Sequence, residues 1–74
     1  MTAVSIESEV TGTVWKVLVG VGDQVKQDEP LMIIESMKME IPVESTCDGI
    51  VSELCVKEEE GIEEGQVVAL VESS

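Results

Sequence analysis

The side chains able to carry chemistry in this 74-residue chain are four lysines, two cysteines and 16 carboxylates, because the sequence contains no histidine and no arginine. Without an imidazole there is no histidine metal ligand or histidine base. Cys47 and Cys55 lie eight residues apart, which is not the spacing of a zinc site or a redox motif. We expect both to be small, partly buried apolar residues and expect no metal site. With so many carboxylates the composition leaves a paired-acid site open, but no carboxylate lies in a recognisable catalytic motif and a domain this small has little room for a deep pocket. We therefore expect a non-catalytic protein.

Lys38 is the lysine with unusual surroundings, because the chain must reverse between two expected strands, residues 30–35 and 39–43. A two-residue turn there would consist of Met37 and Lys38. Such turns favour Asn-Gly or Asp-Gly, because both central residues need positive φ. The alternative is a wider turn in which Met37 and Met39 pack on the body of the domain. Because local rules often fail at functional sites, Lys38 is the candidate functional residue.

The composition indicates one small domain built of strands. Its apolar residues are almost all Val, Ile, Leu and Met, and Trp15 is the only aromatic residue. The β-branched residues Val and Ile dominate, which favours strands over helices. The longest apolar stretches are far shorter than the roughly 18 residues that a membrane span needs. We therefore expect one domain over residues 1–74 and no membrane segment.

The charge of the chain excludes several classes of partner. Sixteen acids against four lysines give a formal net charge of -12. Nucleic acids and anionic membranes both require basic residues, so neither is expected as a partner. The same charge permits a partner with a basic docking face. No basic segment precedes an apolar run at the N-terminus, so we expect a cytoplasmic protein.

The chain repeats itself at an offset of 37 residues without insertion or deletion, so the halves are residues 1–37 and 38–74. Identities at this offset include Glu7 with Glu44, Ser8 with Ser45, Gly12 with Gly49, Val14 with Val51 and Val19 with Val56. Two equal halves predict a quasi-twofold axis. Because the seam lies between Met37 and Lys38, this turn is expected at the pole opposite the two chain ends.

Each half shows the same order of short strands and turns. Alternation near Val4 and Ile41 starts each half, and further strands are expected at 13–19, 30–35, 50–56 and 66–72, with polar turns at 22–24 and 58–61. Trp15, Val17 and Val19 share one parity, as do Ile50, Leu54 and Val56, which assigns each set to one face of its strand. This pattern predicts an all-β sandwich or barrel.

Residues 35–39 read Glu-Ser-Met-Lys-Met, which resembles the attachment signature Glu-Ala/Ser-Met-Lys-Met of biotin carboxyl carrier domains. The resemblance extends over nearly all of the chain, whose length is similar to that of small free-standing biotin/lipoyl attachment proteins. Matching positions are Gly12, Gly22, Asp23, Val25, Asp48, Gly49, Ile50, Val51, Gly61 and Gly65. The sequence departs from the family at Asp28 and Glu59, where Gly is common, and at Thr46, where Pro is frequent.

The resemblance implies a flattened β-barrel of two four-stranded antiparallel sheets, in which Lys38 lies in an exposed hairpin turn. It implies that a biotin protein ligase attaches biotin covalently to Lys38. The chain would then be a carrier between biotin carboxylase and carboxyltransferase subunits or domains. A barrel with paired chain ends is expected to be a monomer on its own.

The residues around Lys38 are candidate contacts for the ligase. Met37 and Met39 would offer adaptable apolar contacts, and Ser36 belongs to the same motif. Glu35 and Glu40 flank the turn, where they orient the hairpin, are read by the ligase, or form an ordinary solvated pair.

Two other functions fit parts of the sequence. A lipoyl carrier of a 2-oxoacid dehydrogenase or glycine cleavage system would share the fold and the exposed lysine, and an acceptor of both groups is a related possibility. Lipoyl domains typically have Asp before the lysine and Ala or Val after it, whereas Lys38 lies between Met37 and Met39. The second alternative is an unmodified interaction module with an acidic face around residues 58–60.

Overall fold

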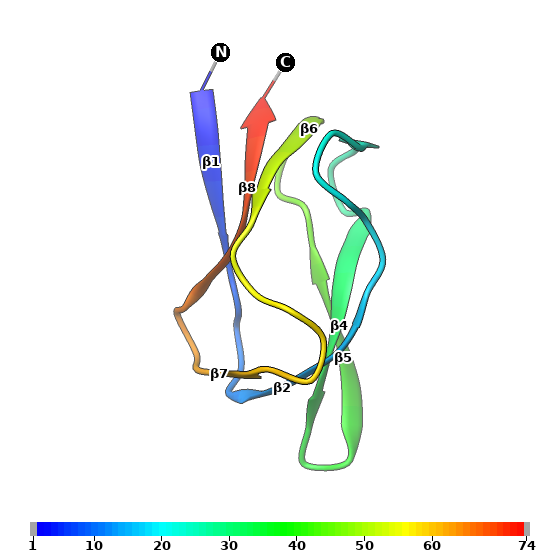
Figure 1. Cartoon of the computed structure of the whole chain (residues 1–74), viewed down its shortest axis with the longest axis vertical. Helices are drawn as coiled ribbons and strands as arrows, with labels where there is room; N and C mark the ends of the chain where they lie inside the picture. The colour runs from blue at the N-terminus through cyan, green and yellow to red at the C-terminus, as the bar shows by residue number, and fades with distance from the viewer. Residues whose placement is uncertain (1, 74) are drawn as a thin grey trace.

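The structure is a computed structural model that describes residues 2–73, and these residues form strands and turns only. The strands are β1 (Thr2–Glu7), β2 (Gly12–Val17), β3 (Gln24–Val25), β4 (Pro30–Ser36), β5 (Met39–Glu44), β6 (Gly49–Leu54), β7 (Gly61–Ile62) and β8 (Val67–Ser73). They build an elongated molecule of 36 × 18 × 18 Å (Figure 1). Within the described range there is no helix long and apolar enough to span a membrane.

The internal repeat predicted from the sequence is confirmed strand by strand. β1, β2, β3 and β4 recur 37 residues later as β5, β6, β7 and β8. Hydrogen bonds in the loops repeat as well. The backbone N–H of Gln27 donates to Asp48 Oδ1 over 2.7 Å, and the equivalent N–H of Glu64 donates to Thr11 Oγ1 over 3.0 Å. The two halves are therefore related by a quasi-twofold axis.

The two halves exchange strands to form two antiparallel sheets. One sheet has the order β1-β8-β6-β3 and the other has the order β5-β4-β2-β7. Each sheet thus contains two strands from each half, and neither half has a complete sheet of its own. The prediction of two four-stranded antiparallel sheets is confirmed. The expected polar turns at 22–24 and 58–61 also contain the starts of β3 and β7, which are too short to show an alternating pattern.

A β-bulge changes the face of Trp15 from the one that its parity predicts. In the pairing of β2 with β4, Val14 lies opposite Ile34 and Lys16 lies opposite Ile33, so Trp15 is the extra residue. Val14 is fully buried, whereas 46% of Trp15 is exposed. An extra residue in one strand shifts the alternation of its side chains. The expected common face of Trp15 and Val17 is therefore wrong.

The second half contains the equivalent bulge. The register between β6 and β8 shifts between Val51 and Glu53. Val51 is fully buried and 42% of Ile50 is exposed, so Ile50 does not share the buried face of Val56. The bulge therefore recurs at the equivalent position of both halves, although alternation along the strand does not predict it.

The core is aliphatic and lies between the two sheets. Its buried residues are Ile6, Val14, Val25, Leu31, Met32, Ile34, Val43, Val51, Val56, Ile62, Val68, Ala69 and Val71. Two quasi-equivalent hydroxyls, of Ser8 and Ser45, are buried among them. Each donates a hydrogen bond of 2.6 Å to a backbone carbonyl two residues ahead, of Val10 and Cys47 respectively. Because both hydroxyls have partners, their burial carries no unsatisfied polar group.

The turns that depart from the family pattern keep the glycine conformation without glycine. Asp28 and Glu59 both have φ of 71°. Their counterparts in the other half are Gly65 and Gly22, with φ of 86° and 96°. Left-handed backbone at a non-glycine residue costs about 1–3 kcal/mol. The surrounding fold, rather than the residue type, therefore determines these turns.

Candidate functional site

The turn that carries Lys38 is a two-residue hairpin turn, as the sequence predicts. Ser36 of β4 pairs with Met39 of β5, which leaves only Met37 and Lys38 in the loop. Their φ values are 52° and 66°. Positive φ at both central residues is the type I′ conformation, for which Asn-Gly is the usual choice. The alternative of a wider turn is therefore wrong.

The side chains at this turn point into solvent. Met37 is 92% exposed and Met39 is 60% exposed, and Lys38 is exposed as well. The alternative in which the methionines pack on the body is thus also wrong. An apolar side chain that the fold leaves in water, next to an accessible amine, is available for contact with another protein.

The base of the hairpin is fixed to the body of the domain. Ile34 is fully buried and pairs with Ile41 across the hairpin. The hydroxyl of Ser36 donates a hydrogen bond of 2.8 Å to the backbone carbonyl of Thr11. These contacts hold β4 in place up to Ser36, so the position of Met37 and Lys38 at the tip is fixed relative to the core.

Glu35 and Glu40 lie directly opposite each other on β4 and β5. Both are exposed. Directly opposed residues have their Cβ atoms about 4.5–5.5 Å apart, and like charges at this position disfavour the pairing. The hairpin thus places two carboxylates side by side, in the residue pair next to the Ser36–Met39 pair that closes the turn. What these carboxylates do for a ligase stays a prediction.

The hairpin turn lies at one pole of the molecule, and the start of β1 and the end of β8 lie at the other (Figure 1). β1 and β8 pair from Thr2 with Ser73 onward, so the first and last described residues are neighbours. The hairpin of β4 and β5 extends from the other end of the long axis. The prediction made from the position of the seam is confirmed.

Trp15 is the exposed aromatic side chain that parity assigned to the wrong face. It lies on β2, beside β4, and the Lys16 ammonium is 5.7 Å from the centre of its ring. With Glu35 and Glu58 it lines a shallow surface depression. The one sequence signal that could have indicated a role for this side chain is that Trp15 is the single aromatic residue of the chain.

The two cysteines differ in exposure. Cys47 is partly buried against the core, as expected, whereas Cys55 is exposed, so the prediction is wrong for Cys55. The bulge after Val51 turns Val56 inward and Cys55 outward. Partial desolvation and then the negative charge of Glu53 raise the pKa of the Cys55 thiol. Among residues 2–73 no group of His, Cys, Asp or Glu side chains is arranged to hold a metal ion.

Comparison with known proteins gives a consistent result over nearly all of the chain. A sequence profile of the family described as "Biotin-requiring enzyme" matches residues 1–71. The chain is 39% identical over 70 residues to the biotin/lipoyl attachment protein of Bacillus subtilis (strain 168), which covers 95% of this chain and 96% of that protein. It is 38% identical over 69 residues to the biotinylated protein TB7.3 homolog of Mycobacterium leprae (strain TN), which covers 93% of this chain and 97% of that protein.

A solved structure with the same fold is part of a large enzyme. The crystal structure of the Kluyveromyces lactis urea carboxylase matches with a TM-score of 0.90 and 37% sequence identity. The match covers 96% of this chain but only 6% of that one. The same fold thus occurs as a small segment within a much longer carboxylase chain.

Proposed function

The chain belongs to the family of biotin- and lipoyl-attachment domains, and on that premise we propose that it is a biotin carboxyl carrier with Lys38 as the attachment residue. The observation that carries the proposal is the two-residue turn of Met37 and Lys38. Both residues have positive φ and exposed side chains at the pole opposite the chain ends. The tight turn leaves the Lys38 side chain exposed at the tip of the hairpin.

The exposed amine of Lys38 fits a covalently attached biotin. Attachment forms one amide bond between the lysine ε-amine and the biotin carboxylate, so it needs access and no enclosed pocket. Formation of the amide releases a proton from the amine, and the chain offers no histidine to accept it. A ligase therefore has to activate the carboxylate as an adenylate and accept the proton. AMP is the leaving group when the amide forms.

The role of the protein after attachment is transport. When bound, biotin supplies a ureido ring that accepts and donates a carboxyl group. The hairpin holds the base of the arm at the end of the long axis opposite the start of β1 and the end of β8. A tether raises the effective concentration of the arm at each partner site. The partners are a biotin carboxylase and a carboxyltransferase, a proposal supported by the urea carboxylase that contains this fold.

The Met37→Asp variant is expected to be a poor substrate for biotin protein ligase and to fold like the wild type. Met37 is 92% exposed, so its replacement removes an apolar contact for the ligase without disturbing the core. We expect the second-order rate of labelling to fall roughly tenfold, the size expected for a loss of 1–2 kcal/mol. The measurement is intact mass against time, with thermal unfolding followed in parallel.

The matched control is Val21→Asp, which introduces the same charge at a residue that is 65% exposed and lies outside the hairpin. It should leave the rate of labelling unchanged. Equal rates for wild type, Met37→Asp and Val21→Asp would show that the ligase does not contact Met37.

A lipoyl carrier is the second candidate, because the Bacillus subtilis relative is named for both groups. The test is to incubate the purified chain either with biotin protein ligase, biotin and ATP or with lipoate ligase, lipoate and ATP, and to follow the intact mass. We expect complete addition of one biotinyl group before lipoylation is appreciable. Faster lipoylation would favour the second candidate, and no addition in either mixture would contradict both.

A further inference from the structure

The open edges of β1 and β5 face each other across a groove on the side of the molecule. β1 pairs only with β8 and β5 pairs only with β4, so each is an edge strand of its sheet. A cavity of about 280 Å³ lies between them. Edge strands carry unpaired backbone N–H and C=O groups, which are a template for the addition of another strand. The quasi-twofold axis relates the two edges to each other.

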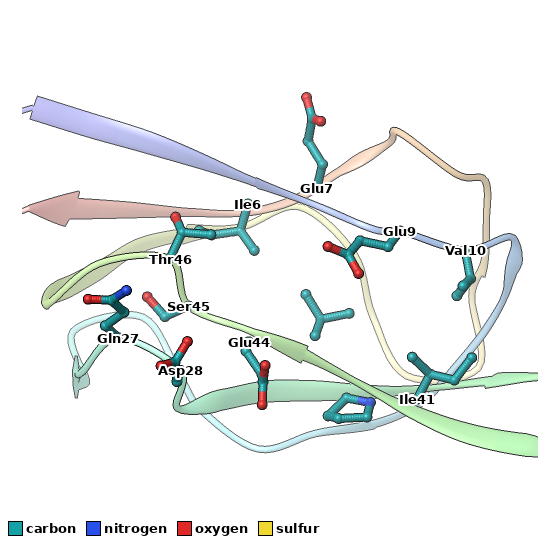
Figure 2. A pocket seen from close by; sticks show the side chains of 12 residues that line it. Ile6, Glu7, Glu9, Val10, Gln27, Asp28, Ile41, Glu44, Ser45 and Thr46 are labelled. Carbon is teal, nitrogen blue, oxygen red and sulfur yellow. The ribbon is translucent and has the colours of Figure 1, made fainter.

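The groove has an apolar floor and an acidic rim (Figure 2). Ile6 and Val10 from the β1 side, and Ile41 and Val43 from β5, line it. The carboxylate-bearing residues that line it are Glu7, Glu9, Asp28 and Glu44. Figure 2 shows the Glu9 side chain reaching over the groove, with Asp28 and Glu44 across from it, whereas Glu7 points outward.

A second cavity continues the groove across the axis. It is lined by Ser5, Glu7, Ser8, Glu9, Thr46, Glu64 and Gly65. At the repeat offset of 37 residues, every one of these positions maps onto a residue that lines the first cavity. Glu7, Glu9 and Thr46 line both cavities. The two cavities are therefore halves of one trough, which we name the seam groove.

The seam groove is anionic along its whole length. Its lining contains five acidic residues and none of the four lysines. The acidic residues have no metal-binding arrangement among the described residues. A second copy of a chain with a charge of -12 would be repelled. Charge complementarity thus selects a cationic occupant, and the apolar floor between two open strand edges selects an extended chain.

We propose that the seam groove binds an extended segment of a partner protein in which lysine or arginine alternates with apolar residues. Such a segment adds backbone hydrogen bonds at an open edge, places its apolar side chains on Ile41 and Val43, and brings its cations to Glu9 and Glu44. The groove uses the distal part of β5, so Lys38 stays accessible while the segment is bound. The proposal does not depend on the group that Lys38 carries.

The experiment titrates the full chain with a peptide of alternating lysine and valine at physiological salt and measures Kd by calorimetry and methyl chemical shifts by NMR. We expect saturable binding with shifts concentrated at Ile6, Ile41 and Val43. In the Glu9→Gln/Glu44→Gln variant Kd should rise roughly fivefold or more, since each lost charge contact contributes modestly. The same titration on the Lys38→Arg variant should give the wild-type Kd.

The matched control is Glu53→Gln/Glu72→Gln, which removes the same two charges from exposed positions outside the groove. Kd for this variant should change less than twofold. An equal loss in both double variants would mean that the peptide senses only net charge, and absence of saturable binding would also overturn the proposal. Biotinylation of the Glu9→Gln/Glu44→Gln variant at the wild-type rate would show that groove and attachment turn act separately.

Discussion

Replacement of Lys38 by arginine is expected to abolish attachment of biotin, with no biotinyl addition in the intact mass after prolonged incubation with ligase, biotin and ATP. The guanidinium keeps the length and charge of the side chain but stays protonated, so it offers no free nitrogen lone pair to the activated carboxylate. The fold should not change, because Lys38 is exposed at the tip of the hairpin. This is the largest effect that any single substitution should have on labelling.

The other three lysines are the controls for this result. Lys16, Lys26 and Lys57 are exposed, as Lys38 is, but each lies outside the two-residue turn with positive φ. Arginine at any one of them should leave one biotinyl group per chain and an unchanged rate. Labelling of the Lys38→Arg variant would contradict the assignment, and loss of labelling in a control variant would move the site to that residue.

The positions of most strands could be predicted because the same strand pattern occurs twice in the sequence. A repeat without gaps means that a weak pattern near Val4 is supported by an independent one near Ile41. The seam of the repeat also predicted the pole at which Lys38 lies, which Figure 1 confirms. The two-residue turn was predicted because few residues separate the two flanking strands in the sequence. The positive φ values that such a turn requires are confirmed at Met37 and Lys38.

Three features could not be predicted, each because tertiary contacts outweigh local pattern. The bulge that exposes Trp15 depends on how β2 pairs with β4, which alternation along one strand does not report. The strands β3 and β7 have two residues each, too few for any period. The left-handed backbone at Asp28 and Glu59 opposes residue preference and is held by neighbouring hydrogen bonds, such as Glu59 N–H to Val14 C=O at 2.6 Å.

The same principle explains why the candidate site was easier to predict than the groove. The evidence for Lys38 is local in the sequence, because the motif, the seam of the repeat and the turn type all concern consecutive residues. The seam groove brings together Glu9, in the loop after β1, and Glu44, at the end of β5, and β1 and β5 belong to different sheets. An excess of acidic residues in the composition indicated a basic partner, but only the fold shows where the acids surround an apolar floor.

The Gly49→Ala variant is expected to be strongly destabilised, because β6 passes too close to β8 for a side chain at this position. A Cβ on Gly49 would overlap the backbone carbonyl oxygen of Glu72 and lie 2.8 Å from the carbonyl carbon and 3.0 Å from Val71 Cγ1. The obstacle is backbone in a central pair of strands, so it cannot rotate away as a side chain would. Overpacking typically costs about 1–3 kcal/mol, and we expect the upper end of that range here because the obstacle is backbone.

That loss is a large part of the stability available to the domain. A chain of this length is stabilised by roughly 4–11 kcal/mol in total, so the melting temperature should fall by on the order of 10 °C or more. Thermal unfolding followed by circular dichroism measures the effect. Gly12→Ala should behave alike, because its Cβ would overlap the carbonyl oxygen of the quasi-equivalent Glu35.

Gly61→Ala separates close approach from a general intolerance of glycine replacement. Its Cβ would meet nothing within 4 Å, and the backbone of Gly61 does not have positive φ. Its free energy of unfolding should therefore change by less than about 0.5 kcal/mol. Equal melting temperatures for Gly49→Ala and Gly61→Ala would contradict the packing of β6 on β8. A selective loss at Gly12 and Gly49 would show that each half needs glycine where its second long strand passes its own last strand, β2 against β4 and β6 against β8. The repeat would then preserve a packing constraint as well as a pattern.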